Sequence, residues 1–152
     1  MASTPSDGAP TPSHVTDRFG FRFTPAYRAA GLCFAITPNR THAVIAPSGL
    51  AVRFGPWRVA TGLENIAQID LTGPYAFLKT AGPARLALTD RGLTFATNGQ
   101  RGVRLTFHQS IKGIEPTGRL RHPELTLTLA DVDGFADRLA ILGRDAGVAM
   151  RR

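Results

Sequence analysis

The chain has little cysteine: Cys33 is the only one in 152 residues. A single cysteine excludes an intrachain disulfide and is typical of proteins in a reducing compartment. No apolar run approaches the ~20 residues that a membrane-spanning helix needs. Residues 1–16 are mostly Ala, Ser, Thr, Pro and Gly, and they lack the apolar core of a secretory signal. We therefore expect a cytoplasmic protein.

Acidic residues are also few, because 11 Asp and Glu stand against 18 Lys and Arg, and the formal net charge is +7. Lysine is scarce as well: Lys79 and Lys112 are the only two, and the other basic residues are arginines. An arginine-rich chain with excess positive charge favours phosphate and carboxylate partners. Codon usage in a GC-rich genome is the alternative explanation for the arginines, and composition alone leaves both open.

Motifs for catalysis and cofactor binding are missing. The sequence has neither a G-x-G-x-x-G nor a P-loop pattern, and no serine lies in a nucleophile elbow. The histidines show neither metal-ligand spacing nor an accompanying cysteine cluster; they are His14, His42, His108 and His122. We expect no catalytic residue, no cofactor and no metal site, and hence a protein that is not an enzyme.

Hydrophobic periodicity indicates a single domain. We expect a flexible tail at residues 1–17, one β-rich domain at 18–143 and a flexible C-terminus at 144–152. Thr24 and Pro25 predict the start of a short helix, because a hydroxyl residue often caps a helix that begins with proline.

From Thr41 onward, short segments alternate apolar and polar residues between turns rich in Gly, Pro and Asn, which is typical of antiparallel strands. One of them, at 75–79, reads as an edge strand. The last such segment, 125–129, leads into an amphipathic stretch that starts at Asp131 and should end near Gly143. The predicted fold class is α+β, mainly antiparallel β: a bent sheet or small barrel of about seven strands, closed by a C-terminal helix and preceded by a short helix.

Alternation along these strands also places basic side chains on the face that points away from the core. Arg53 opposes Val52 and Phe54, and the same parity holds for Arg58, Arg104 and His108. If their strands are neighbours, these four side chains share one outer face that could bind an anion. A solvated outer face is the alternative.

A second basic cluster precedes the last strand, where Arg119, Arg121 and His122 lie within four residues. It could clamp an anion, or it could be a turn whose charges face water.

Several short motifs resemble those of a family of small, uncharacterised actinobacterial proteins over roughly residues 19–143. The motifs are FGPWR at 54–58, TGPY at 72–75, GPARL at 82–86, DRGLTF at 90–95 and RHP at 121–123. The resemblance implies no activity. The order of short antiparallel strands followed by one helix also resembles the bacterial pleckstrin-homology-like (PH-like) fold, which implies a bent sheet with the helix over one open end.

Three functions are compatible with these observations. The first is a non-catalytic binding or interaction module that recruits a protein or peptide, or a second copy as a homodimer, at a sheet edge. The second is binding of anionic lipid headgroups at a membrane surface, or of another polyanion, through the arginines; nucleic acid is disfavoured because few aromatic residues accompany the basic ones. The third is a small-molecule carrier or enzyme that uses the barrel interior.

Overall fold

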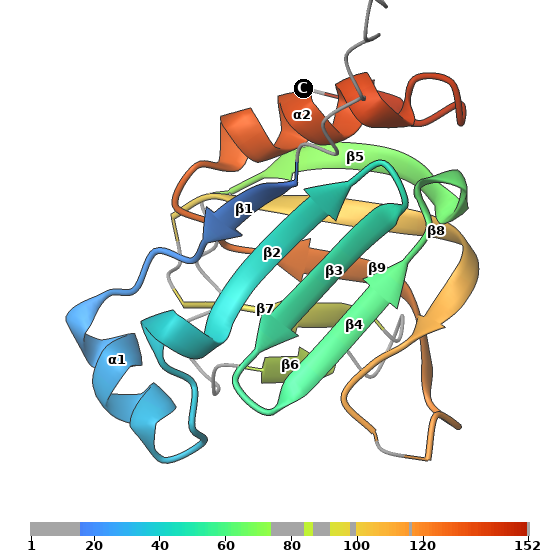
Figure 1. Cartoon of the computed structure of the whole chain (residues 1–152). Helices are drawn as coiled ribbons and strands as arrows, with labels where there is room; N and C mark the ends of the chain where they lie inside the picture. The colour runs from blue at the N-terminus through green and yellow to red at the C-terminus, as the bar shows by residue number, and fades with distance from the viewer. Residues whose placement is uncertain (1–15, 74–83, 87–91, 98–99, 116, 152) are drawn as a thin grey trace, which may run out of the picture.

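The computed structural model describes residues 16–73, 84–86, 92–97, 100–115 and 117–151. In this part of the chain, strands form two sheets that lie face to face, with their strands running in different directions (Figure 1). The α+β class with mainly antiparallel pairing is therefore confirmed. The expected strand at 75–79 lies outside the described residues, as does most of the tail at 1–17.

The first sheet is an antiparallel meander in which each strand pairs with the next along the chain. Its strands are β1 (Asp17–Gly20), β2 (Thr41–Ala46), β3 (Gly49–Phe54) and β4 (Trp57–Thr61).

The second sheet has the strand order β10-β5-β8-β9-β7-β6. Its strands are β5 (Ile66–Thr72), β6 (Ala84–Leu86), β7 (Leu93–Phe95), β8 (Gly102–Lys112), β9 (Arg121–Leu127) and β10 (Ala149–Arg151). Two pairs in this sheet are parallel, β7 with β9 and β10 with β5. Strand β10 lies within residues 144–152, the segment that the sequence analysis expects to be a flexible C-terminus.

The helices are α1 (Pro25–Leu32), α2 (Val132–Gly143) and two short 3₁₀ turns, η1 (Pro38–Arg40) and η2 (Leu63–Asn65). Helix α2 begins after Asp131 and ends at Gly143, as the sequence predicts. Its start is fixed by the N-cap, because Oδ1 of Asp131 accepts a hydrogen bond from the Gly134 N–H at 2.8 Å. Helix α1 begins at Pro25 as expected, but most of its residues are exposed. No helix within the described ranges is long and apolar enough to span a membrane.

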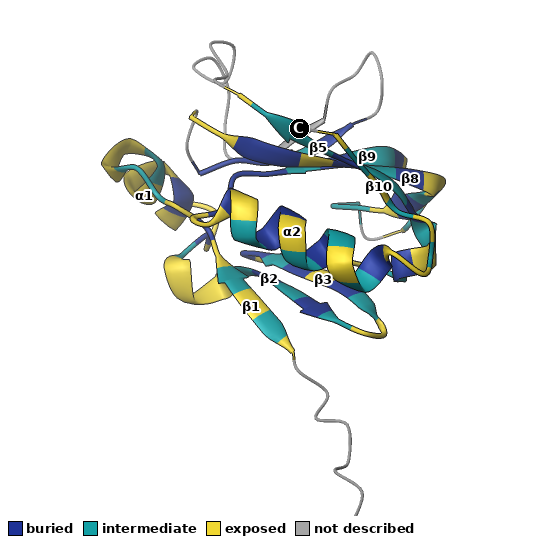
Figure 2. Cartoon of the chain, turned by 90° about the horizontal axis from the view of Figure 1, so that it is seen from above, coloured by how far each residue is buried: buried dark blue, intermediate teal, exposed yellow. Residues whose placement is uncertain are grey.

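The core lies between the two sheets, and α2 covers one end of it (Figure 2). Phe54 of β3 stacks on Phe95 of β7 with ring centroids 4.6 Å apart, which joins the two layers. Phe135 of α2 meets Phe19 of β1 edge to face at 5.2 Å. The C-terminal helix therefore buries its apolar side as the sequence predicts.

The two layers do not merge into a closed barrel within the described residues. Instead, the segment after β1 is held against the second sheet: the Ala130 N–H donates to the Gly20 carbonyl at 2.9 Å, and the Thr24 N–H donates to the Thr97 carbonyl at 3.2 Å. The expectation of one bent sheet or small barrel is therefore replaced by two packed sheets joined along this side.

Candidate functional site

A row of basic side chains crosses the outer face of the first sheet. In β3, Val52 and Phe54 are buried while Arg53 points outward. The register pairs Arg53 with His42 of β2 on one side and with Arg58 of β4 on the other. Residues paired in this way on one face have Cβ atoms roughly 5 Å apart, so the three side chains are direct neighbours.

The turn between β3 and β4 fixes this arrangement. Only Gly55 and Pro56 separate the two strands, so the strand ends are held in tight register. Gly55 has φ +60°, and a Cβ there would meet Cγ1 of Ile36 at 2.8 Å. Glycine is therefore required both by backbone conformation and by space.

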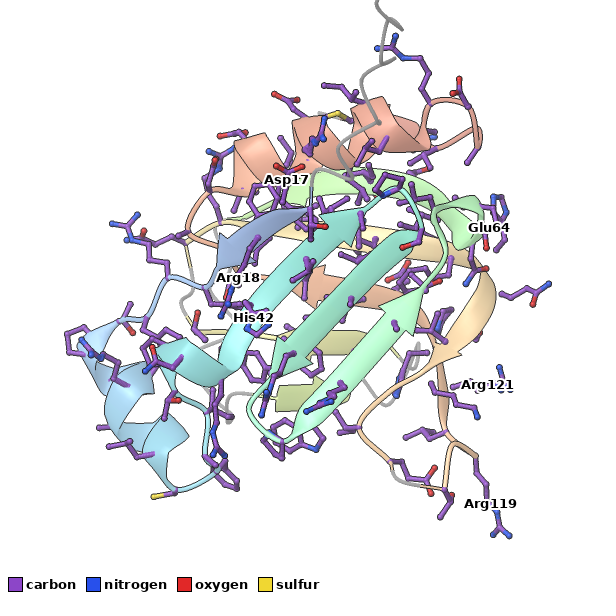
Figure 3. The ribbon with its side chains drawn as sticks, viewed as in Figure 1. Asp17, Arg18, His42, Glu64, Arg119 and Arg121 are labelled. Carbon is purple, nitrogen blue, oxygen red and sulfur yellow. The ribbon has the colours of Figure 1, made fainter. Side chains whose placement is uncertain are left out.

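Strand β1 adds a fourth basic side chain. Nη2 of Arg18 lies 3.2 Å from Nδ1 of His42. Because a guanidinium only donates hydrogen bonds, a hydrogen bond between these atoms requires Nδ1 to accept, which corresponds to the neutral tautomer with its proton on Nε2. We call Arg18, His42, Arg53 and Arg58 the cationic row; Figure 3 shows Arg18 and His42 side by side on β1 and β2.

Among the described residues, no carboxylate forms a salt bridge with the arginines of this row. Asp17 precedes Arg18 in the chain but pairs with Arg138 of α2 at 2.5 Å. The pKa of His42 is lowered from 6.5, first by partial burial and then by the positive charges of Arg18 and Arg53. The row therefore concentrates positive charge that no carboxylate in the described part of the chain neutralises through a salt bridge.

A shallow hollow of about 300 Å³ opens beside the row, lined by His42, Arg53 and Arg58 together with small apolar residues of the same face. Its chemistry is that of an anion-binding surface, since guanidinium groups make charge-assisted, often bidentate hydrogen bonds to phosphate and carboxylate.

The expectation that Arg104 and His108 share this face is wrong. Both lie on β8 and alternate with buried residues, so they point away from the core on the outer side of the second sheet. Nε of Arg104 is also 3.8 Å from a carboxylate oxygen of Asp70, its neighbour on β5. The strands that carry the four predicted residues belong to two different layers.

The second basic cluster, at 119–122, is built differently from the expectation. His122 is fully buried and lies against Gly113, so it is not available to an external anion. Arg119 and Arg121 are exposed on the β8–β9 hairpin, far across the molecule from His42 (Figure 3).

This hairpin already contains its own anion. The Glu115 carboxylate accepts hydrogen bonds from the Arg119 N–H at 2.8 Å and the Leu120 N–H at 3.1 Å, and also from the Thr117 hydroxyl. The pKa of Glu115 is lowered by these bonds, most strongly by that of Thr117. The backbone donors of the turn are therefore already in use, which makes it a weaker anion site than the cationic row.

The sequence analysis missed Arg18 and His42. The signal was present, because Arg18 alternates with Phe19 and Phe21, and His42 alternates with Ala43 and Ile45, all of which point toward the core. In the described ranges, no group of three His, Cys, Asp or Glu side chains is placed to hold a metal ion.

Comparison with protein-family models, with curated proteins and with solved structures found no match to this chain. The resemblance to small actinobacterial proteins stays a prediction from the motifs.

Proposed function

We propose that the protein is a non-catalytic binding module that holds an anionic group of its partner against the cationic row. The observation that carries this proposal is the convergence of Arg18, His42, Arg53 and Arg58 from four adjacent strands with no carboxylate partner in the described residues. A phosphate or carboxylate placed there would accept hydrogen bonds from several guanidinium groups at once.

The scaffold supports the same role. Two packed sheets with α2 across one end of a filled core support the proposal of a PH-like architecture, and the cationic row lies on the outside of this scaffold. Because one fold can host many functions, this likeness supports the architecture only. The proposed function is supported by the cationic row.

The proposal is tested with tripolyphosphate as the probe, followed by NMR chemical shifts of the His42 ring and the arginine side chains. The double variant Arg53→Gln/Arg58→Gln should bind at least roughly tenfold more weakly, because each lost charged hydrogen bond is worth about 1.5–3 kcal/mol.

A matched control removes the same two charges elsewhere. Arg119 and Arg121 lie exposed on the β8–β9 hairpin. The variant Arg119→Gln/Arg121→Gln should bind tripolyphosphate within about twofold of the unmodified protein, because the lower net charge has only a small effect at moderate salt. Equal weakening by the two double variants would mean that net charge alone attracts the probe, and the proposal would fail.

A further inference from the structure

The hollow beside the cationic row continues along the sheet. A second hollow of about 400 Å³ shares Val44, Ala51 and Ala60 with the first and extends to Gly49 and Gly62. The register pairs Val44 with Ala51 and Ala51 with Ala60, so these residues form a second row parallel to the basic one. Together the hollows make one shallow groove that runs along β2, β3 and β4.

The floor of this groove is apolar and made of small residues. Ala51 and Ala60 are exposed, and glycines occupy the far end at 49 and 62. The Glu64 carboxylate lies over Gly62, because a Cβ added there would collide with it. The groove is therefore positive at the end of Arg53 and Arg58, and Arg18, which the register pairs with Val44, adds positive charge on its β1 side. The Glu64 carboxylate, from η2, lies next to the other end without lining the groove; Figure 3 shows Glu64 and His42 on opposite sides of the first sheet.

We infer that the partner is an amphipathic α-helix of another protein, which lies along this groove with acidic residues of its C-terminal turn over Arg53 and Arg58. This inference rests on the proposed function, and it adds the kind of partner and its direction.

The backbone of the groove explains why a helix is favoured over an extended peptide. Strands β2 and β3 each have hydrogen-bonded neighbours on both sides, and the described strands of this sheet have free ladder positions only at the outer edges of β1 and β4. A strand added at those edges would pair beside the groove and would not lie on its floor. A helix satisfies its own backbone groups. Small residues on the floor allow the helix axis to approach closely, as Gly and Ala do at helix interfaces.

The dimensions and the dipole agree with this partner. The groove spans three rows of outward residues, and neighbouring rows are two residues apart along each strand. The outermost rows are therefore about 13 Å apart at ~3.3 Å per residue. A helix of about nine residues has that length at 1.5 Å per residue. A helix C-terminus carries partial negative charge and an N-terminus partial positive charge, which matches the basic row and Glu64 respectively.

Two other occupants fit less well. Membrane-surface helices bind through large apolar side chains such as Trp, Phe and Leu, whereas most residues that line this groove are Ala, Gly and Val. A second copy of the chain brings a net charge of +7 toward a basic row, and α1, its most exposed helix, has no acidic residue.

The test uses two stapled peptides of about 15 residues, each with an Ala/Leu face and matched helicity by circular dichroism. One carries glutamates in its last turn and the other carries them in its first turn. Fluorescence anisotropy should show binding of the first peptide to the full chain roughly tenfold tighter than binding of the second, because only the first aligns both its charges and its dipole with the groove.

Groove variants supply the second readout. Ala51→Phe and Ala60→Phe fill the groove from exposed positions and should each weaken peptide binding about tenfold through steric exclusion. Ala29→Phe makes the same change on exposed α1 and should leave binding unchanged. Circular dichroism of each variant confirms that the fold is retained.

The outcomes separate this inference from the function on which it rests. No peptide binding, equal binding of both peptides, or indifference to Ala51→Phe overturns the helical partner. The proposed function stands in each of these cases if tripolyphosphate binding still depends on Arg53 and Arg58. Two other results, in the absence of peptide binding, assign the groove to a different occupant. Sedimentation with phosphatidylglycerol vesicles that depends on the cationic row assigns it to a membrane. Concentration-dependent dimerisation that depends on the row assigns it to a second copy of the chain.

Discussion

The stacked pair Phe54 and Phe95 is the contact whose removal most directly tests the two-layer fold. Phe54 belongs to the first sheet and Phe95 to the second; both are fully buried, and their rings are nearly parallel at 7°. The perturbation is a double-mutant cycle of Phe54→Ala, Phe95→Ala and the combined variant.

The structure sets the size of the expected effect. Each replacement removes a whole buried ring and leaves a cavity, which costs about 3–5 kcal/mol of unfolding free energy. Aromatic pairs in contact contribute about 0.5–1.5 kcal/mol beyond their burial, so the double variant should lose that much less than the sum of the single losses. Because small domains have about 5–15 kcal/mol of stability, the milder Phe54→Leu serves if an alanine variant is unfolded.

Urea unfolding provides the assay, with fluorescence of the single Trp57 and far-ultraviolet circular dichroism followed together. Trp57 stacks on Phe54 at 6.4 Å, so its fluorescence reports on this part of the core. Phe34→Ala is the matched control, because Phe34 is 55% exposed and its loss should change stability by no more than about 0.5 kcal/mol. A coupling energy near zero, or separate transitions for the two probes, would refute the packing of the two sheets into one core.

Three further predictions follow from single side chains. Asp131→Ala removes the N-cap of α2 and should cost about 1 kcal/mol in urea unfolding. In an NMR titration, the pKa of His42 should lie below 6.5, and in Arg18→Gln it should rise toward 6.5. Because the ring binds a proton more readily in the unfolded chain, His42 should lower the free energy of unfolding only as the pH falls through 6.5 toward the pKa of the folded state. Arg53 and Arg58 are like charges that face each other across β3 and β4, so Arg58→Gln should raise the free energy of unfolding by about 0.2–1 kcal/mol at low salt. Salt screens this repulsion, so the gain should be smaller in 1 M salt.

The elements with a strong local signal could be predicted from the sequence. The strand around Val52 follows from strict alternation, and α2 follows from the Asp131 cap together with Phe135 and Leu139, which are both fully buried. Such signals depend on a few neighbouring residues, and tertiary packing here agrees with them.

The arrangement of the strands could not be predicted in the same way. Alternation shows that one face of a strand is buried, but it does not show which strand lies beside it. Strand β9 pairs with β7 in parallel across the long β8 hairpin, and β10 pairs with β5 from the far end of the chain. Both pairings join segments about 30 or more residues apart, and no local pattern encodes them.

The candidate site was predictable to the same extent. Arg53 and Arg58 are neighbours because a two-residue turn joins their strands, which is a local feature. Arg104 and His108 have the correct parity but belong to the other sheet, since parity assigns a face and not a layer. His122 is buried out of phase with Leu125 and Leu127, because the pairing of β9 with β8 is irregular between Glu124 and His122, and no local pattern shows such an irregularity.

The placement of the cationic row argues for a binding face over a merely solvated one. Codon usage can explain why arginine replaces lysine, but it does not explain three arginines and a histidine gathered on one face with no salt bridge to a carboxylate of the described residues. Like charges on paired strands oppose folding, and a surface that served only solubility would interleave both signs. An anion held between the guanidinium groups reverses each of these costs: it replaces repulsion with attraction, and it favours the protonated ring of His42. Under the proposed function, the anionic group of a bound partner balances the charges of this face.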